Sequence, residues 1–312
     1  MNIKKIGLTA LAGSLVATSA FAGSLSASGG ASLTFSNSDD KSHAAEGNQW
    51  TMGDSITFTG SGEMDNGMTI SVSYELDGDA ADTGSTLDSH SMTLDTNGMG
   101  TIAFVGHGGS SAMSAIDDKT PNAYEESWDI VSGADTGTRV TGSSGNNMFT
   151  YTSPSFSGAT VTVAYLNASD AITDVSYMDF AIAASPEAVD GLTVGFGMGE
   201  TEETSGTAID DTTMYATYTY GSVTVGISQS ESDGPNASND IDFNALGVSY
   251  AVTDDFTIAY STSDAKKGSD SDKQEASGIS ASYTSGGITV GGAMNTVDNV
   301  AYDATADLEG YE

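Results

Sequence analysis

The chain has 312 residues, is rich in glycine (38) and poor in proline (4), and carries 43 acidic against 8 basic residues, a formal net charge of −35. So negative a chain repels nucleic acid, which disfavours a phosphate-binding role. There is no cysteine, which excludes disulfides and thiolate metal sites. Hydrophobic residues make up only 38% of the chain, a low share for a protein with a large dry core.

The first 22 residues have the pattern of a cleavable signal peptide. Residues 1–5 form a short basic region, residues 6–17 are mostly apolar, and residues 20–22 supply a small-residue cleavage site. The alternative is a retained membrane helix, but the apolar run is shorter than the ~20 residues that such a helix needs. We therefore expect an exported protein whose mature chain is residues 23–312.

After residue 23, apolar residues recur at every second position. In the segment 68–76, Met68, Ile70, Val72 and Tyr74 share one face, and threonine, serine and glutamate occupy the other. This alternation predicts strands with one face in lipid and the other in water. Strands are predicted at 24–36, 54–63, 68–76, 85–95, 101–106, 147–153, 159–166, 176–184, 192–199, 212–220, 223–230, 241–252, 256–263, 273–284 and 288–295, with one more beginning near 308.

Two of these strands break the alternation. Leu87 and Leu94 fall on opposite faces of the strand predicted at 85–95, as do Phe243 and Leu246 of the strand at 241–252. A β-bulge or a misplaced strand boundary would explain either case.

The connections between the strands alternate in length. Short turns rich in Gly, Asn and Asp occur at 64–67, 96–98, 155–158, 185–191, 221–222, 253–255 and 285–287, and longer polar connections at 37–53, 77–84, 107–146, 167–175, 200–211, 231–240, 264–272 and 296–307. Transmembrane barrels place short turns at the periplasmic end and long loops outside. A soluble β-sandwich gives no reason for this alternation. The expected fold class is therefore all-β, a transmembrane antiparallel β-barrel of 16 strands. Because the chain stops at Glu312, we expect the last strand to be truncated.

The connection 107–146 is far longer than the others. Loops of this length are usually functional or disordered. It holds a possible helical turn at 112–116, followed by apolar residues mixed with acids. Folded inward, it would rest Ile116, Tyr124 and Trp128 on the barrel wall and turn its acids into the lumen as a constriction that favours cations. The alternative is an ordinary solvated loop. The candidate constriction residues are Asp117, Asp118, Glu125, Glu126, Asp129 and Arg139.

These features together resemble the general porins of alphaproteobacteria. The resemblance is carried by the signal ending at 20–23, the first mature strand at 24–36, and the runs 116–121 and 124–128. It implies a sixteen-stranded outer-membrane barrel, usually a homotrimer, through which small hydrophilic solutes diffuse without energy input. It also implies that the third external loop, here 107–146, folds into the channel.

Two features depart from the family pattern. Family members usually face the acidic loop with basic residues on the barrel wall, and they end in an aromatic residue, whereas this chain ends in Glu312. We therefore expect a cation preference, because the mature chain keeps few basic residues, all in or beside predicted loops. These residues are Lys41, Lys119, Arg139, Lys266, Lys267 and Lys273.

Other chemistry is poorly represented. His43, His90 and His107 are too scattered in the sequence to indicate a catalytic or zinc site, and we expect no enzyme, no resident metal and no cofactor. Acid clusters at 39–40 and 200–203 are candidates for weakly bound Ca²⁺, although neither has the spacing of a known calcium loop. The leading hypothesis is a passive, cation-preferring channel whose partners are outer-membrane lipid, small solutes and cations. The alternative is a secreted acidic Ca²⁺-binding adhesin or surface-layer protein.

Overall fold

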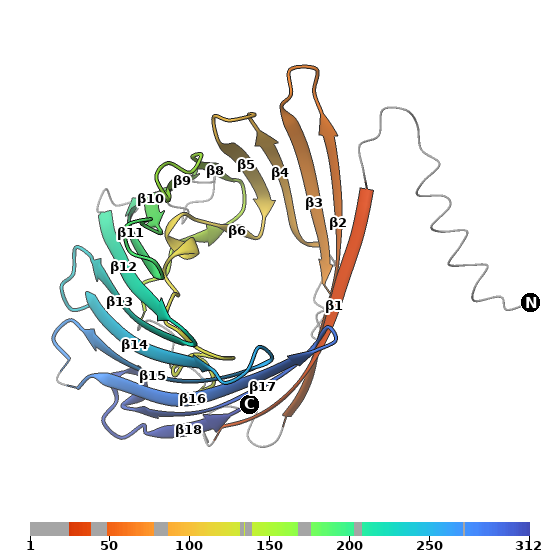
Figure 1. The fold of residues 1–312 in the computed structure, drawn as a ribbon. Helices are drawn as coiled ribbons and strands as arrows, with labels where there is room; N and C mark the ends of the chain where they lie inside the picture. The colour runs from red at the N-terminus through yellow and green to blue at the C-terminus, as the bar shows by residue number, and fades with distance from the viewer. Residues whose placement is uncertain are drawn as a thin grey trace, which may run out of the picture.

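The structure, a computed structural model, describes residues 25–38, 49–77, 87–131, 134, 139–167, 176–202, 208–270 and 272–312. The predicted signal peptide and the acidic pair at 39–40 lie outside the described residues. Sixteen antiparallel strands close into one barrel, in which each strand pairs with its neighbours in the chain and β1 meets β18 (Figure 1). No described helix is long and apolar enough to cross a membrane.

The barrel strands lie close to the predicted ranges, which confirms the expected sixteen-stranded fold. They are β1 (Leu25–Ser38), β2 (Gln49–Glu63), β3 (Thr69–Asp77), β4 (Leu87–Asp95), β5 (Thr101–His107), β8 (Met148–Thr152), β9 (Ala159–Leu166), β10 (Ser176–Ala184), β11 (Leu192–Glu202), β12 (Ala208–Tyr220), β13 (Val223–Asp233), β14 (Ile241–Ala251), β15 (Phe256–Lys267), β16 (Gln274–Ser285), β17 (Ile288–Asp298) and β18 (Leu308–Tyr311). Outside the barrel sheet lie a two-stranded sheet of β6 (Gly109–Ser110) and β7 (Ser144–Gly145), and the 3-10 helices η1 (Met113–Ala115) and η2 (Val300–Tyr302).

The two faces of the barrel invert the pattern of a soluble protein. In β13, the outward side chains of Val225 and Ile227 are 42% and 51% exposed, whereas the inward Ser228 is 4% exposed. Large apolar side chains face outward on almost every strand, where only lipid can cover them without cost. All backbone groups of such a wall must pair within the sheet, and closure into a barrel satisfies this requirement.

Several strands run further at their outer ends than the apolar pattern predicts. β11 continues to Glu202, β13 to Asp233, β15 to Lys267 and β17 to Asp298. These extensions are mostly polar and charged, so hydrophobic alternation could not reveal them. Cross-strand backbone pairing nevertheless continues there, for example between Glu275 and Asp298.

The two breaks in alternation have different causes. Leu87 pairs with Leu76 through a register shift in the β3–β4 pairing, so a β-bulge accounts for the first case. The second case has neither a bulge nor a displaced boundary, since β14 pairs with β13 without interruption. Phe243 faces the lumen because it packs against a loop inside the barrel, and it is buried there.

Candidate functional site

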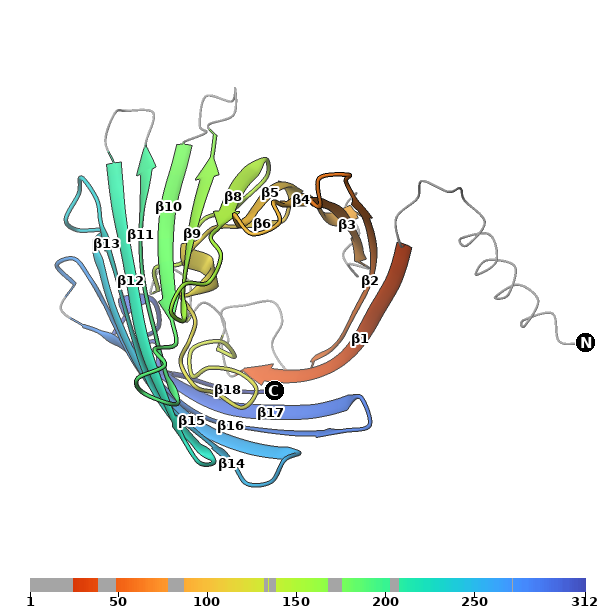
Figure 2. The ribbon, with the colours of Figure 1, turned by 45° about the horizontal axis from the view of Figure 1, so that its top comes forward.

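The long segment between β5 and β8 lies inside the barrel (Figures 1 and 2). Its two ends are joined where β6 pairs with β7, with Gly109 opposite Gly145. Between them the chain crosses the lumen and contacts the inner wall from β10 to β18. We call the described residues of this segment, 109–131, 134 and 139–145, the lumen loop.

An inward carboxylate on the wall holds the start of the lumen loop. Asp179 of β10 accepts hydrogen bonds from the backbone N–H groups of Ala112 (3.1 Å) and Met113 (2.8 Å), just where η1 begins. These N–H groups would otherwise lack partners at the helix start, and the carboxylate satisfies two of them. η1 confirms the helical turn predicted at 112–116, and Ile116 behind it is buried against the wall.

The second anchor of the lumen loop is aromatic. Trp128 is 1% exposed and meets Phe243 of β14 edge-on, with ring centroids 5.2 Å apart and planes at 89°. Around the pair lie Val131 of the loop and small apolar residues of the wall, which leave room for the indole: Ala245, Ala265, Ala276 and Val297. An edge-to-face aromatic pair of this kind adds about 0.5–1.5 kcal/mol to the burial of its surface.

Glycines on the inner wall clear the path of the loop. A Cβ on Gly226 would lie 2.5 Å from Pro121 Cδ, and one on Gly247 would lie 2.5 Å from the Pro121 carbonyl oxygen. A Cβ on Gly291 of β17 would overlap the Tyr124 ring. Glycine inside a strand usually weakens the strand. Here glycine is needed because the loop approaches the backbone of the wall closely. The alternation pattern did not single out these residues, although inward glycines far from any turn are the signal that identifies them.

Inward serines of the wall bind the backbone of the lumen loop, which has no strand partner of its own over most of its length. Serine hydroxyls accept from the N–H groups of Ala123 (Ser280, 3.1 Å), Ser127 (Ser261, 3.1 Å) and Val140 (Ser230, 3.2 Å), and Asn295 donates to the Glu126 carbonyl (2.6 Å). Buried backbone groups need such partners. The polar inner face of the wall therefore holds the loop in position through hydrogen bonds, in addition to making the channel hydrophilic.

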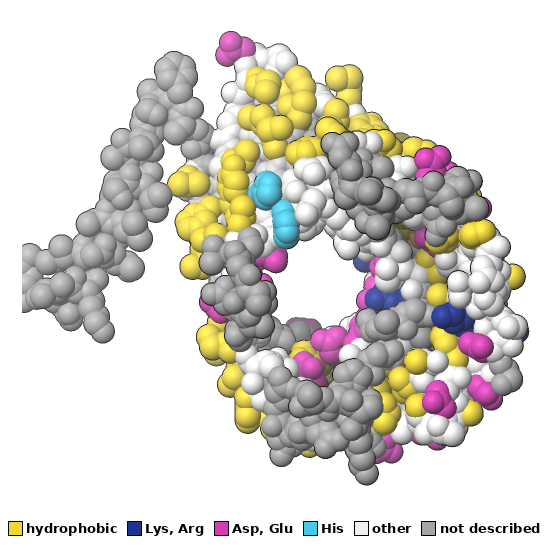
Figure 3. Space-filling model, turned by 180° about the vertical axis from the view of Figure 1, so that it is seen from behind, with side chains coloured by type: hydrophobic (Ala, Val, Ile, Leu, Met, Phe, Trp, Pro, Cys, Tyr) yellow, Lys and Arg dark blue, Asp and Glu magenta, His cyan; other side chains and the backbone are white. Residues whose placement is uncertain are grey.

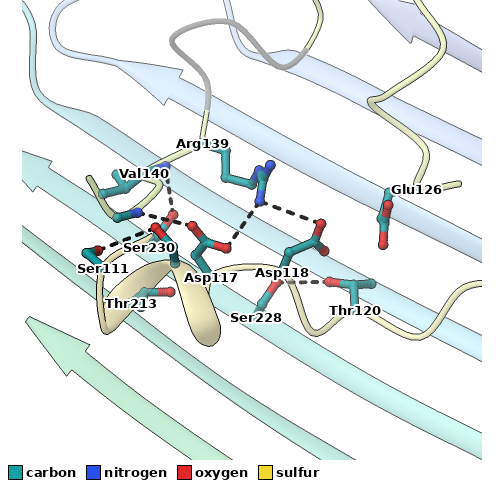
Figure 4. A network of polar contacts seen from close by, with 12 residues as sticks. Ser111, Asp117, Asp118, Thr120, Glu126, Arg139, Val140, Thr213, Ser228 and Ser230 are labelled. Carbon is teal, nitrogen blue, oxygen red and sulfur yellow. Dashed lines mark hydrogen bonds and ion pairs between the residues drawn. The ribbon is translucent and has the colours of Figure 1, made fainter. Parts of the chain in front are cut away.

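Arg139 is shared by two acids of the loop (Figure 4). Its guanidinium lies 3.7 Å from a carboxylate oxygen of Asp117 and 3.7 Å from one of Asp118. Asp117 also accepts a hydrogen bond from the N–H of Gly142 (3.1 Å). Burial raises the pKa of Asp117 and of Asp118, and the nearby Arg139 opposes the rise in both. One positive charge is thus divided between two carboxyl groups.

A second acidic group consists of Glu125, Glu126 and Asp129, whose carboxylate oxygens lie within 4.8 Å of one another. Burial first, and then the charge of Asp129, raise the pKa of Glu125 to about 7. Burial first, and then a hydrogen bond with Asp129, raise the pKa of Glu126 to about 9. Near neutral pH, Glu126 is therefore protonated and Glu125 is about half ionised. The three carboxyl groups are also the described residues that could share a hard cation such as Ca²⁺.

The six candidate constriction residues all belong to the lumen loop but differ in contact with water. Asp117 and Glu126 are 8% and 7% exposed, whereas Asp118, Glu125 and Asp129 keep more of their surface accessible. Acidic side chains lie at several points around the opening in Figure 3. Among the described basic residues, Arg139 alone is ion-paired with the loop acids, while Lys273 pairs with Asp264 (2.8 Å). Lys41 lies in an undescribed stretch.

Of the two calcium clusters predicted outside the loop, only part of the one at 200–203 lies among the described residues. Glu200 and Glu202 alternate with Thr201 along β11 and stand at its outer end. Glu203 falls in an undescribed gap.

The comparisons with known proteins agree with this architecture. The family model described as Gram-negative porin matches residues 7–302. The chain belongs to the Gram-negative porin family. Among solved structures, a triple mutant of the Rhodopseudomonas blastica porin is similar, with a TM-score of 0.69 and 18% identity over 92% of this chain and 99% of that one. The anion-selective porin from Comamonas acidovorans is similar at a TM-score of 0.68 and 15% identity, over 92% and 98%. No match was found among curated proteins.

Membership in this family indicates an outer-membrane channel protein. The lumen loop lies where such a channel must be narrowed if it is to discriminate among solutes. The same fold is found in an anion-selective porin, so ion preference depends on the side chains of the loop and wall.

Proposed function

We propose that this porin is a passive diffusion channel for small hydrophilic solutes and ions that prefers cations. The observation that carries the proposal is the charge of the lumen loop. Six acids and two basic residues, Lys119 and Arg139, lie between residues 117 and 139, and Arg139 is already shared by Asp117 and Asp118. A carboxylate-rich constriction raises the local concentration of cations and excludes anions.

The experiment is a measurement of single channels in planar bilayers across a KCl gradient. A cation-preferring channel gives a reversal potential of the sign set by K⁺, and the preference must weaken as salt rises because screening shortens the reach of the loop charges. A reversal potential of the opposite sign, or one that does not respond to neutralisation of Asp118 and Asp129, would reject the proposal.

We further propose export through the predicted signal peptide and assembly as a homotrimer in the outer membrane. Support for assembly comes from the family resemblance and from the apolar outward faces of the strands. Chemical cross-linking in detergent before heating tests the trimer, and recovery of monomers alone would contradict it. Weak Ca²⁺ binding by the acidic clusters stays a prediction. The secreted adhesin is no longer favoured, because the family and the barrel point to a membrane channel.

A further inference from the structure

Two histidines 17 positions apart in the sequence face each other on the barrel wall. His90 of β4 is the direct cross-strand partner of His107 of β5, because a register shift after His90 brings His107 opposite it. Their ring centroids are 6.4 Å apart and their planes differ by 15°. Figure 3 shows the two side chains next to each other, beside hydrophobic side chains near the rim of the opening.

The pair lies on the outward face, away from the lumen loop. His90 pairs with Tyr74 of β3, which is 47% exposed on the lipid-facing side, and the rings of the two residues are stacked with centroids 6.4 Å apart. On its other side the His90 ring covers Gly106, where a Cβ would overlap the imidazole. A glycine thus makes room for His90 in the way that wall glycines make room for the lumen loop.

The hydrogen bonds of the two rings leave nitrogen lone pairs available. His107 Nδ1 is hydrogen-bonded to the backbone carbonyl of Asp88, which only accepts, so Nδ1 carries the proton and Nε2 keeps its lone pair. His90 Nδ1 is buried and has no hydrogen-bond partner among the described residues. A carbonyl that orients one ring nitrogen while the other stays free is the usual arrangement around metal-binding histidines.

We propose that His90 and His107 form a two-imidazole binding site for a divalent transition-metal ion of the Cu²⁺, Ni²⁺ or Zn²⁺ class, with water completing the coordination. Neutral imidazole suits these ions, and Ca²⁺ and Mg²⁺ prefer oxygen ligands. With metal–nitrogen bonds of about 2.0–2.1 Å, a tetrahedral site needs ring centroids about 5 Å apart. The rings therefore approach by roughly 1 Å and tilt, which rotation of the exposed His107 side chain provides.

Two properties of the chain favour occupancy of this site. A protein with a formal net charge of −35 concentrates divalent cations near its surface, and the pair stands at the outer ends of β4 and β5 where it is reached from water. The site does not use the lumen loop, so it is independent of the proposed ion preference.

The test is Cu²⁺ binding to the refolded barrel in detergent with an excess of Mg²⁺, which occupies the carboxylates. We expect one Cu²⁺ per chain with two nitrogen ligands in the electron paramagnetic resonance spectrum. His90→Asn and His107→Asn should each weaken binding more than about tenfold and remove one nitrogen, and acidification should release the ion because protons compete for imidazole. His43→Asn, the matched control, should bind like the wild type.

Several results would overturn the proposal. Wild-type binding in either His90→Asn or His107→Asn, or a wild-type spectrum with fewer than two nitrogens, excludes the pair. Cu²⁺-dependent association of barrels in size-exclusion chromatography would place the ion between copies instead. Heat-modifiable gel migration and circular dichroism establish that each variant is folded, so a loss of binding reports on the site.

Discussion

The raised pKa values of the two glutamates in the lumen loop predict that ion preference depends on pH in two steps. With a pKa of about 7, Glu125 changes from mostly protonated to mostly ionised between pH 6 and 8. Glu126, with a pKa of about 9, ionises only above that range. Both pKa values are raised because burial disfavours the charged carboxylate, so each step adds negative charge as pH rises. Cation preference should therefore increase with pH, first near 7 and again near 9.

The size of the first step follows from Coulomb's law. One charge acting on a permeating ion about 5 Å away in a water-like medium contributes about 0.8 kcal/mol. Screening at 0.1 M salt reduces this to about 0.5 kcal/mol, about a twofold change in local cation concentration. Because the same charge repels anions, the ratio of cation to anion permeability should change by about fourfold between pH 6 and 8.

The assay is the reversal potential in a KCl gradient, recorded for the same channels as pH is changed symmetrically. Glu125→Gln should remove the step near pH 7 and keep the step near pH 9, and Glu126→Gln should do the reverse. Glu309→Gln, on β18 and outside the loop, serves as the matched control and should retain both steps. A permeability ratio that stays constant from pH 5 to 10, or a Glu125→Gln channel that keeps the lower step, would refute the reasoning.

Three further changes test the construction of the site. Asp117→Asn combined with Asp118→Asn leaves the loop arginine uncompensated, so cation over anion permeability should fall, and an unchanged reversal potential would mean that these acids do not act on permeating ions. Gly247→Leu should displace the loop and change single-channel conductance, whereas Gly30→Leu, where an added Cβ meets no atom within 4 Å, should not; equal effects would contradict the wall-clearance argument. Trp128→Ala removes a buried anchor at a cost of about 3–5 kcal/mol, so protease cleavage in the loop should accelerate, and unchanged cleavage kinetics would show that the indole does not hold it.

Most of the fold could be predicted from the sequence alone. Every second residue of a membrane-spanning strand must be apolar, and backbone pairing inside lipid leaves barrel closure as the solution for strands. The alternation in 68–76 therefore located β3 to within a residue, and short and long connections predicted the hairpin order. Only the polar outer ends of strands such as β13 escaped this reasoning, because their side chains leave the apolar band while their backbones stay paired.

The sequence located the acids of the lumen loop but did not reveal their surroundings or protonation. The sequence placed Asp117 and Glu126 among the loop acids, yet local pattern could not show that both are buried, or that one takes a share of Arg139 and the other is protonated near neutral pH. These properties depend on which wall residues lie behind the loop, and barrel closure brings those from positions far along the chain.

Contacts between distant segments were decided by the tertiary structure. Phe243 broke the alternation of its strand because Trp128, more than one hundred residues earlier, packs on it inside the barrel. His90 and His107 appeared scattered, and a register shift between two strands made them neighbours. The two-residue period of a strand determines which face of the barrel wall a residue occupies. The register between strands and the docking of the loop decide which residues it contacts there.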